Sequence, residues 1–72
     1  MNVLPNNFFD TLTWYNGLDA NDNLFSLHRF LTAHGFRPIY EKTHDGIMIW
    51  ENCYSFQVSI TVDDVGNLNL TF

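Results

Sequence analysis

The stretch from Ile47 to Val62 constrains the fold of this chain more than any other part of the sequence. In its second half, apolar and polar side chains alternate along the chain. The apolar ones are Tyr54, Phe56, Val58, Ile60 and Val62. Successive side chains of a strand point to opposite faces, so this period of two indicates a β-strand with one buried face. The sequence therefore predicts a sheet that buries one face.

The chain is short for a protein that must bury a core. It has 72 residues, so we expect a single domain over residues 1–72 that buries only about 60% of its extended-chain surface. Cys53 is the only cysteine, so no disulfide is expected within the chain. Its stability then depends on dense packing of aromatic side chains, which make up 17% of the residues, or on oligomerisation.

The charge of the chain limits the partners that it can have. Three basic residues stand against eight acidic ones, and the net charge is −5. Nucleic acids and anionic membranes are bound by clustered Lys and Arg, so we expect neither as a direct partner. Separately, we expect no cofactor. A protein partner of basic charge fits the sign better.

The same sequence favours a cytoplasmic location. No apolar run approaches the roughly 18 residues of a membrane span, and the N-terminus shows neither the charged region nor the apolar region of a signal peptide. A single cysteine suits a reducing compartment.

Residues 1–20 allow two interpretations. A short helix would be capped by Asn6 or Asn7 after Pro5 and ended by Gly17. It would place three large side chains on one face: Phe8, Leu12 and Tyr15. An extended segment would instead alternate these side chains between two faces. We favour the helix, although Thr, Trp and Tyr are mediocre helix formers.

The sequence of residues 22–34 predicts an amphipathic helix. Asn21 or Asp22 is the expected N-cap, and Gly35 the expected left-handed residue after the C-terminus, followed by Phe36. At 100° per residue, one stripe of this helix is apolar and needs a core to face; its members are Leu24, Leu27, Phe30 and Leu31.

Three hairpins should follow the helix. A three-residue loop with a left-handed Gly46 would pair Tyr40 with Trp50. A two-residue turn at Asn52-Cys53 would pair Ile49 with Phe56, and a three-residue loop over 64–66 would pair Ile60 with Leu70. The second and third registers match apolar with apolar residues, which a slip of one residue would destroy.

These elements define an α+β fold, with one amphipathic helix packed on a four-stranded antiparallel β-meander. The face that the helix should cover carries Ile39, Ile47, Ile49, Tyr54, Phe56, Val58, Ile60, Val62, Leu68, Leu70 and Phe72. The other face is polar except for a cluster of three residues, Tyr40, Met48 and Trp50.

This cluster is the first candidate site. Tyr, Trp and Met are enriched in the cores of protein interfaces, and Trp and Tyr are frequent hot spots. The alternative is that the N-terminal segment folds over the cluster and makes a second small core.

The last strand, residues 67–72, is the second candidate. It should lie at a sheet edge, and it has no Lys, Pro or charge to block pairing with another chain. Leu68, Leu70 and Phe72 would then contact a partner strand or a second copy of the chain. The alternative is that the N-terminal segment pairs with this edge.

The titratable residues give weak signals. Asp45, Asp63 and Asp64 lie in predicted turns, where Asp is favoured for its local hydrogen bonds. His28 and His34 are six residues apart on a helix, so they cannot share a metal as an i, i+4 pair would. We therefore expect no metal site and no catalytic residue.

The order of elements in this chain resembles the layout of the HicA-type ribonuclease toxins, which are small double-stranded-RNA-binding-like domains. The resemblance lies in a helix ending at Gly35-Phe36, then a strand, His44 and two further strands. The resemblance implies a catalytic role for His44. Where that family carries Gly-Ser-His, this chain has Lys42-Thr43-His44, and the flanking basic residues and C-terminal helix of the family have no counterpart here.

The sequence thus predicts a small acidic, non-enzymatic protein-binding module, an inhibitor or adaptor of the kind that phages and mobile elements encode. It would bind a host protein through Tyr40, Met48 and Trp50, and through the last strand. The alternatives are a small ribonuclease that uses His44 and a structural subunit that only self-assembles.

Overall fold

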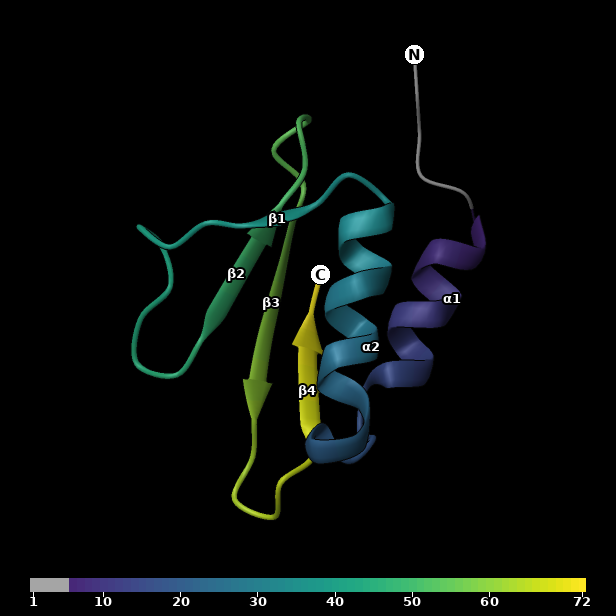
Figure 1. Ribbon diagram of the computed structural model, residues 1–72, viewed down its shortest axis with the longest axis vertical. Helices are drawn as coiled ribbons and strands as arrows, with labels where there is room; N and C mark the ends of the chain where they lie inside the picture. The colour runs from purple at the N-terminus through teal and green to yellow at the C-terminus, as the bar shows by residue number, and fades with distance from the viewer. Residues whose placement is uncertain (1–5) are drawn as a thin grey trace.

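The computed structural model describes residues 6–72 and has the predicted α+β architecture (Figure 1). The elements in chain order are α1 (Asn6–Tyr15), α2 (Ala20–Ala33), β1 (Arg37–Pro38), β2 (Met48–Glu51), β3 (Gln57–Val62) and β4 (Leu68–Thr71). The strands form one antiparallel sheet in the order β1-β2-β3-β4, which is a meander. The predicted fold class is confirmed.

Helix α1 decides between the two interpretations of the N-terminal segment. It places Phe8, Leu12 and Tyr15 on one buried face, as the helical interpretation requires. Gly17 follows it with φ +93°, a conformation that glycine adopts without strain. Pro5, which the predicted N-cap would follow, lies outside the described residues.

Helix α2 begins two residues earlier than predicted. Its N-cap is Asp19, not Asn21 or Asp22, because Asp19 has an extended backbone and its carboxylate accepts the N–H of Asp22 at 3.1 Å. The C-terminus follows the prediction: Gly35 has φ +85°, and the N–H of Phe36 donates to Leu31 O at 3.0 Å. This is a Schellman motif, which gives the last carbonyls of the helix hydrogen-bond donors.

The register of β3 and β4 is confirmed. Ile60 lies opposite Leu70, and Val62 opposite Leu68. Their loop is the expected one, closed by the N–H of Asp63 donating to Asn67 O at 2.9 Å, with Gly66 at φ +88°. The pattern of apolar side chains on both strands therefore determined their pairing.

The predicted register of β2 and β3 is wrong by three residues. Ile49 lies opposite Ser59 instead of Phe56, and Trp50 lies opposite Val58. The loop is longer than predicted because Asn52 organises it: the carboxamide oxygen accepts the N–H groups of Tyr54 and Phe56, each at 2.9 Å.

Ser55 completes this loop in a left-handed conformation with φ +67°. Because the slip is an odd number of residues, it exchanges the two faces of β2. Met48 and Trp50 thus face the helices, and Ile49 lies on the opposite face.

The predicted register of β1 and β2 is also wrong. Pro38, not Tyr40, lies opposite Trp50. After Pro38 the chain leaves the strand and makes a helical turn, in which the N–H of Lys42 donates to Ile39 O at 3.0 Å. Asp45 and Gly46 then form a two-residue hairpin turn with φ +50° and +79°, the geometry for which Asp-Gly is favoured.

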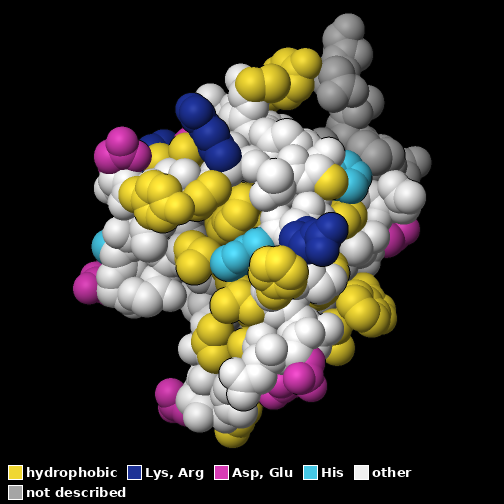
Figure 2. Space-filling model, viewed as in Figure 1, with side chains coloured by type: hydrophobic (Ala, Val, Ile, Leu, Met, Phe, Trp, Pro, Cys, Tyr) yellow, Lys and Arg dark blue, Asp and Glu magenta, His cyan; other side chains and the backbone are white. Residues whose placement is uncertain are grey.

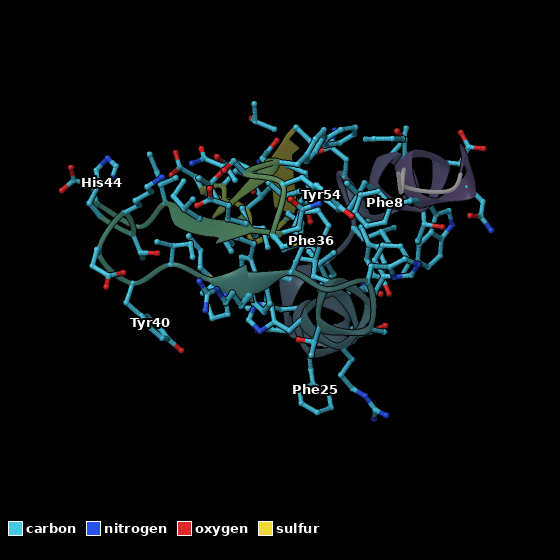
Figure 3. All side chains as sticks on the ribbon, turned by 90° about the horizontal axis from the view of Figure 1, so that it is seen from above. Phe8, Phe25, Phe36, Tyr40, His44 and Tyr54 are labelled. Carbon is cyan, nitrogen blue, oxygen red and sulfur yellow. The ribbon has the colours of Figure 1, made fainter. Side chains whose placement is uncertain are left out.

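The core lies between the helices and one face of the sheet. It contains Phe8, Leu12, Tyr15, Ala20, Leu27, Leu31, Phe36, Trp50, Val58, Ile60 and Leu68. Figures 1 and 3 show α2 across this face and α1 beside the β4 edge of the sheet. Of the residues predicted to face the helix, Tyr54 is exposed, and Ile49 is buried but lies outside this cluster.

Candidate binding pocket

Tyr40, Met48 and Trp50 are brought together, but on the side of the sheet that α2 covers. They line a pocket of about 210 Å³ together with His28 from α2, Pro38 from β1 and Thr43 from the turn before β2. Figure 2 shows this side, where hydrophobic side chains gather around a histidine near the centre. The predicted cluster therefore exists, although its placement on the polar face of the sheet is wrong.

Trp50 forms the deep part of this pocket. Its side chain is only 4% exposed, and its ring lies against that of His28 with the ring centroids 4.9 Å apart. Trp50 itself is thus inaccessible to a large partner surface, whereas Tyr40 is 78% exposed and Met48 is half-buried.

Two buried polar atoms of the pocket residues make no hydrogen bond to any described group of the protein: His28 Nε2 and Trp50 Nε1. The indole N–H can only donate, while a neutral imidazole has one donor and one acceptor nitrogen. Burying such a group without a partner costs roughly 1–3 kcal/mol. Both atoms have almost no solvent-accessible surface, so this unmet hydrogen-bonding capacity lies behind the open surface of the pocket.

The hydroxyl of Thr43, another polar group of the pocket residues, already makes hydrogen bonds within the protein. It donates to Ile39 O at 3.1 Å and accepts the N–H of Ile49 at 3.2 Å. These bonds fix the turn over residues 39–43 beside β2, and so they position Tyr40 at the pocket.

The sequence analysis missed three residues of the pocket, Pro38, Thr43 and His28; the titratable one is His28. Its place beside Leu27, at the border of the apolar stripe of α2, was the available signal. Desolvation by burial lowers the pKa of His28 from its ordinary value, since a buried imidazolium loses hydration. Burial thus favours the neutral ring.

This shift predicts a loss of stability in mild acid. Because the pKa is lower in the native state, the unfolded chain binds the proton more tightly below the ordinary pKa of about 6.5. The free energy of unfolding should therefore fall as the pH drops below that value, and level off at the native pKa. Denaturant titrations over this range should show a shallower fall in the His28→Gln variant; an identical fall in both proteins would contradict the assignment.

Two exposed aromatic residues lie on the same side of the molecule as the pocket. Phe25 is 72% exposed and lies one helical turn before His28 on α2, while Tyr40 lines the pocket itself. Figure 3 shows both side chains pointing away from the sheet in the same direction. The guanidinium of Arg29 lies 5.8 Å from the ring centroid of Phe25, in the range of a cation–π contact.

The prediction that the edge of β4 is free is wrong. The segment that joins α1 to α2 pairs with it: the N–H of Leu68 donates to Leu18 O at 2.8 Å, and Leu68 O accepts the N–H of Gly17 at 2.7 Å. Further along, the N–H of Leu70 donates to Asn16 Oδ1 at 2.9 Å. The alternative, in which the N-terminal part covers this edge, is the one observed.

The three predicted contact residues of the last strand therefore differ in accessibility. Leu68 is fully buried, Leu70 is half-buried and Phe72 is exposed. At the opposite edge, β1 is two residues long and includes Pro38. A short edge strand and a proline each hinder pairing with another strand.

His44, Asp63 and Cys53 lie in the connections between strands. His44 is at the far end of the β1–β2 connection, as Figure 3 shows, and its Nδ1 lies 2.8 Å from Lys42 O. Asp63 accepts the N–H groups of Asn67 and Val65, and these bonds, that from Asn67 foremost, lower the pKa of its carboxyl group. Cys53 is exposed in the loop after β2.

Within residues 6–72, no group of three or more His, Cys, Asp or Glu side chains is arranged to hold a metal ion. No helix in this part of the chain is long and apolar enough to cross a membrane.

Comparison with known proteins assigns the chain to no family: no protein-family model matches it, and no match was found among curated proteins or solved structures. The function must therefore be argued from the site itself.

Proposed function

We propose that this chain is a small acidic, non-enzymatic protein-binding module, which presents the pocket and its two exposed aromatic residues to a protein partner. The observation that carries the proposal is the pocket lined by Tyr40, Met48 and Trp50, with Phe25 exposed on the same side. An aromatic residue beside a small apolar pocket is the arrangement in which interface hot spots are found.

The size of the pocket favours a protein partner over a cofactor. At about 210 Å³, it is smaller than the roughly 300–1,000 Å³ of pockets for drug-sized ligands. A single side chain from a partner surface fits this space better than a nucleotide or a prosthetic group.

The net charge of −5 favours a partner with a basic surface, because opposite charges speed association and suppress wrong partners. An inhibitor or adaptor role, of the kind that phages and mobile elements encode, belongs to this proposal and is motivated by small size and acidity. Because the intramolecular pairing of β4 occupies much of its edge, the proposed contact with a partner centres on the pocket.

The test compares two exposed tyrosines. Immobilised wild-type protein and the Tyr40→Ala and Tyr54→Ala variants are used to capture proteins from a lysate of the source organism. Tyr54 is 62% exposed in the loop after β2 and does not line the pocket, so it controls for loss of any surface aromatic. A partner retained by the wild type and by Tyr54→Ala, but lost from Tyr40→Ala, supports the proposal.

Capture that survives both Tyr40→Ala and Phe25→Ala would contradict the proposed surface. Ribonuclease activity of the purified chain that disappears in His44→Ala would instead favour the enzyme. A stable oligomer without any other partner would favour the self-assembling subunit.

A further inference from the structure

The open surface of the pocket is apolar. Its two buried nitrogen atoms without hydrogen-bond partners have almost no accessible surface, and the hydroxyl of Thr43 is hydrogen-bonded within the protein. An occupant therefore meets mostly carbon, from Pro38, Met48 and the ring of Tyr40. None of the described lining residues is Lys, Arg, Asp or Glu, so a charged group would lose hydration there without gaining a counter-charge. The pocket thus favours one uncharged, apolar side chain, for which its volume of about 210 Å³ gives room.

The charges of the chain are distributed unevenly with respect to this pocket. Residues 28–51 supply every lining residue, and they contain all three basic residues together with three acidic ones, so they carry no net charge. The net charge of −5 therefore comes from five aspartates in the rest of the chain, which are Asp10, Asp19, Asp22, Asp63 and Asp64.

Four of these aspartates lie at one end of the molecule, which we call the acidic end: Asp19, Asp22, Asp63 and Asp64. Asp19 forms an isolated bridge with Asn67 and caps the N–H of Asp22. Asp63 accepts the N–H of the same Asn67 at 2.9 Å, and Asp64 follows it in the β3–β4 loop. Figure 2 shows acidic but no basic side chains at the lower end of the pocket side, where α2 begins and this loop lies.

Helix α2 leads from the acidic end to the pocket. At 100° per residue, Asp22, Phe25 and Arg29 fall on one stripe of the helix, and all three are exposed. His28 lines the pocket six residues after Asp22, which is roughly 9 Å along the axis at about 1.5 Å per residue. An extended segment of a partner covers that distance in about three residues.

We propose that the partner inserts a large apolar side chain into the pocket and places basic side chains, about three residues away along the same segment, on the acidic end. The apolar side chain supplies the buried contact, and the opposite charge at only one end sets the direction of the segment along α2. This proposal rests on the proposed function and specifies the chemistry of the partner.

The methyl signal of Met48 reports occupancy of the pocket in a nuclear magnetic resonance titration of the full chain, because Met48 lines the pocket. The Met48→Leu variant identifies this signal by its loss. Three peptides without terminal charges serve as probes. The lysine peptide is acetyl-Leu-Gly-Gly-Lys-Lys-amide, the glutamate peptide carries glutamates in place of the lysines, and the glycine peptide carries glycine in place of the leucine.

We expect a saturable shift of the Met48 methyl signal with the lysine peptide, with a dissociation constant on the order of millimolar, as for other short flexible ligands. The glutamate peptide should bind roughly three- to tenfold more weakly at low salt, which is the range for a few exposed charge pairs. In about 0.5 M NaCl this difference should shrink, because salt screens exposed charges. The glycine peptide should give no saturable shift.

A pair of double variants identifies the charges that act. Asp22→Asn combined with Asp64→Asn removes charge from the acidic end and leaves unchanged the two aspartates whose carboxylates accept hydrogen bonds in the fold. It should reduce the difference in affinity between the lysine and glutamate peptides to roughly twofold or less. The matched control is Asp10→Asn combined with Asp45→Asn, which changes the net charge equally at exposed positions elsewhere and should keep the difference.

Equal or tighter binding of the glutamate peptide would overturn the proposal, as would the absence of a saturable Met48 shift with the lysine peptide or an equal loss in both double variants. A Met48 signal that moves when the wild-type protein is diluted without any peptide would place a second copy of the chain in the pocket and overturn it too. Each of these results, combined with capture that depends on Tyr40, would leave the protein-binding function standing and remove only this partner chemistry.

Discussion

The Phe8→Ala substitution is expected to destabilise the protein by about 3–5 kcal/mol, the usual loss for a buried phenylalanine. Phe8 is completely buried, and its ring stacks on those of Phe30 and Phe36 with centroids 5.3 Å away in both cases. It thus joins α1 to the end of α2 and to the segment that leads into β1. A chain of 72 residues has a total stability of roughly 4–11 kcal/mol, so much or all of it should be lost.

Trp14→Ala is the matched control, because it removes a large aromatic side chain from the same helix at an exposed position. Its effect should stay within about 0.5 kcal/mol, as for most surface substitutions. Urea denaturation followed by circular dichroism measures both. If the two variants lost similar amounts of unfolding free energy, α1 would not pack through the face that contains Phe8.

Leu68→Ala should have the second largest effect, a loss of about 2–5 kcal/mol. The side chain of Leu68 is fully buried in the core, and its backbone pairs with Gly17 and Leu18. A cavity at this position lies where the connection between the helices meets β4. The substitution therefore tests whether the last strand belongs to the core or serves as a free edge.

Val62→Ala is the control for Leu68→Ala, since Val62 lies directly opposite Leu68 on β3 but is exposed. It should lose less than about 1 kcal/mol. Thermal unfolding and light scattering should be measured together on both variants and on the wild type. If Leu68→Ala left the melting temperature unchanged but converted a dimer into a monomer, Leu68 would belong to an interface and the intramolecular packing would be wrong.

The parts of the fold that the sequence predicted are those where several local signals agree. The Gly35-Phe36 stop of α2 and the pairing of Ile60 with Leu70 each combine a turn signal with a matching apolar pattern. The Asp19 cap was missed because Asn21 and Asp22 are equally good caps by residue type. Only the backbone conformation of Asp19 distinguishes it.

The register of β2 and β3 was missed for a different reason. A left-handed serine at position 55 carries no sequence signal, since that conformation is expected of glycine or asparagine. The apolar run over residues 47–50 contributes two side chains to either face, Met48 and Trp50 or Ile47 and Ile49. The apolar pattern therefore satisfied both registers, and the structure of the Asn52 loop decided between them.

The candidate site was predicted in part. Its residue types identified Tyr40, Met48 and Trp50 as an unusual group, and all three line the pocket. The sequence places His28 at the border of the apolar stripe of α2, but not in the pocket, because it comes from a different element and reaches Trp50 only in the observed register. The covering of the β4 edge likewise depends on a long-range contact, that between Asn16 and Leu70.

The register of β2 against β3 is the central claim, because it places Trp50 in the pocket beside His28. Bonded and non-bonded pairs alternate in an antiparallel ladder, and Asn52 N–H donates to Phe56 O, so Ile49 and Ser59 form a non-bonded pair in which the α-protons lie close together. The most direct measurement is the nuclear Overhauser effect between these α-protons in the wild-type chain. We predict a strong effect between Ile49 and Ser59. A strong effect between the α-protons of Met48 and Gln57 instead, which a two-residue turn at Asn52-Cys53 would make a non-bonded pair, would place Trp50 on the other face and contradict the pocket.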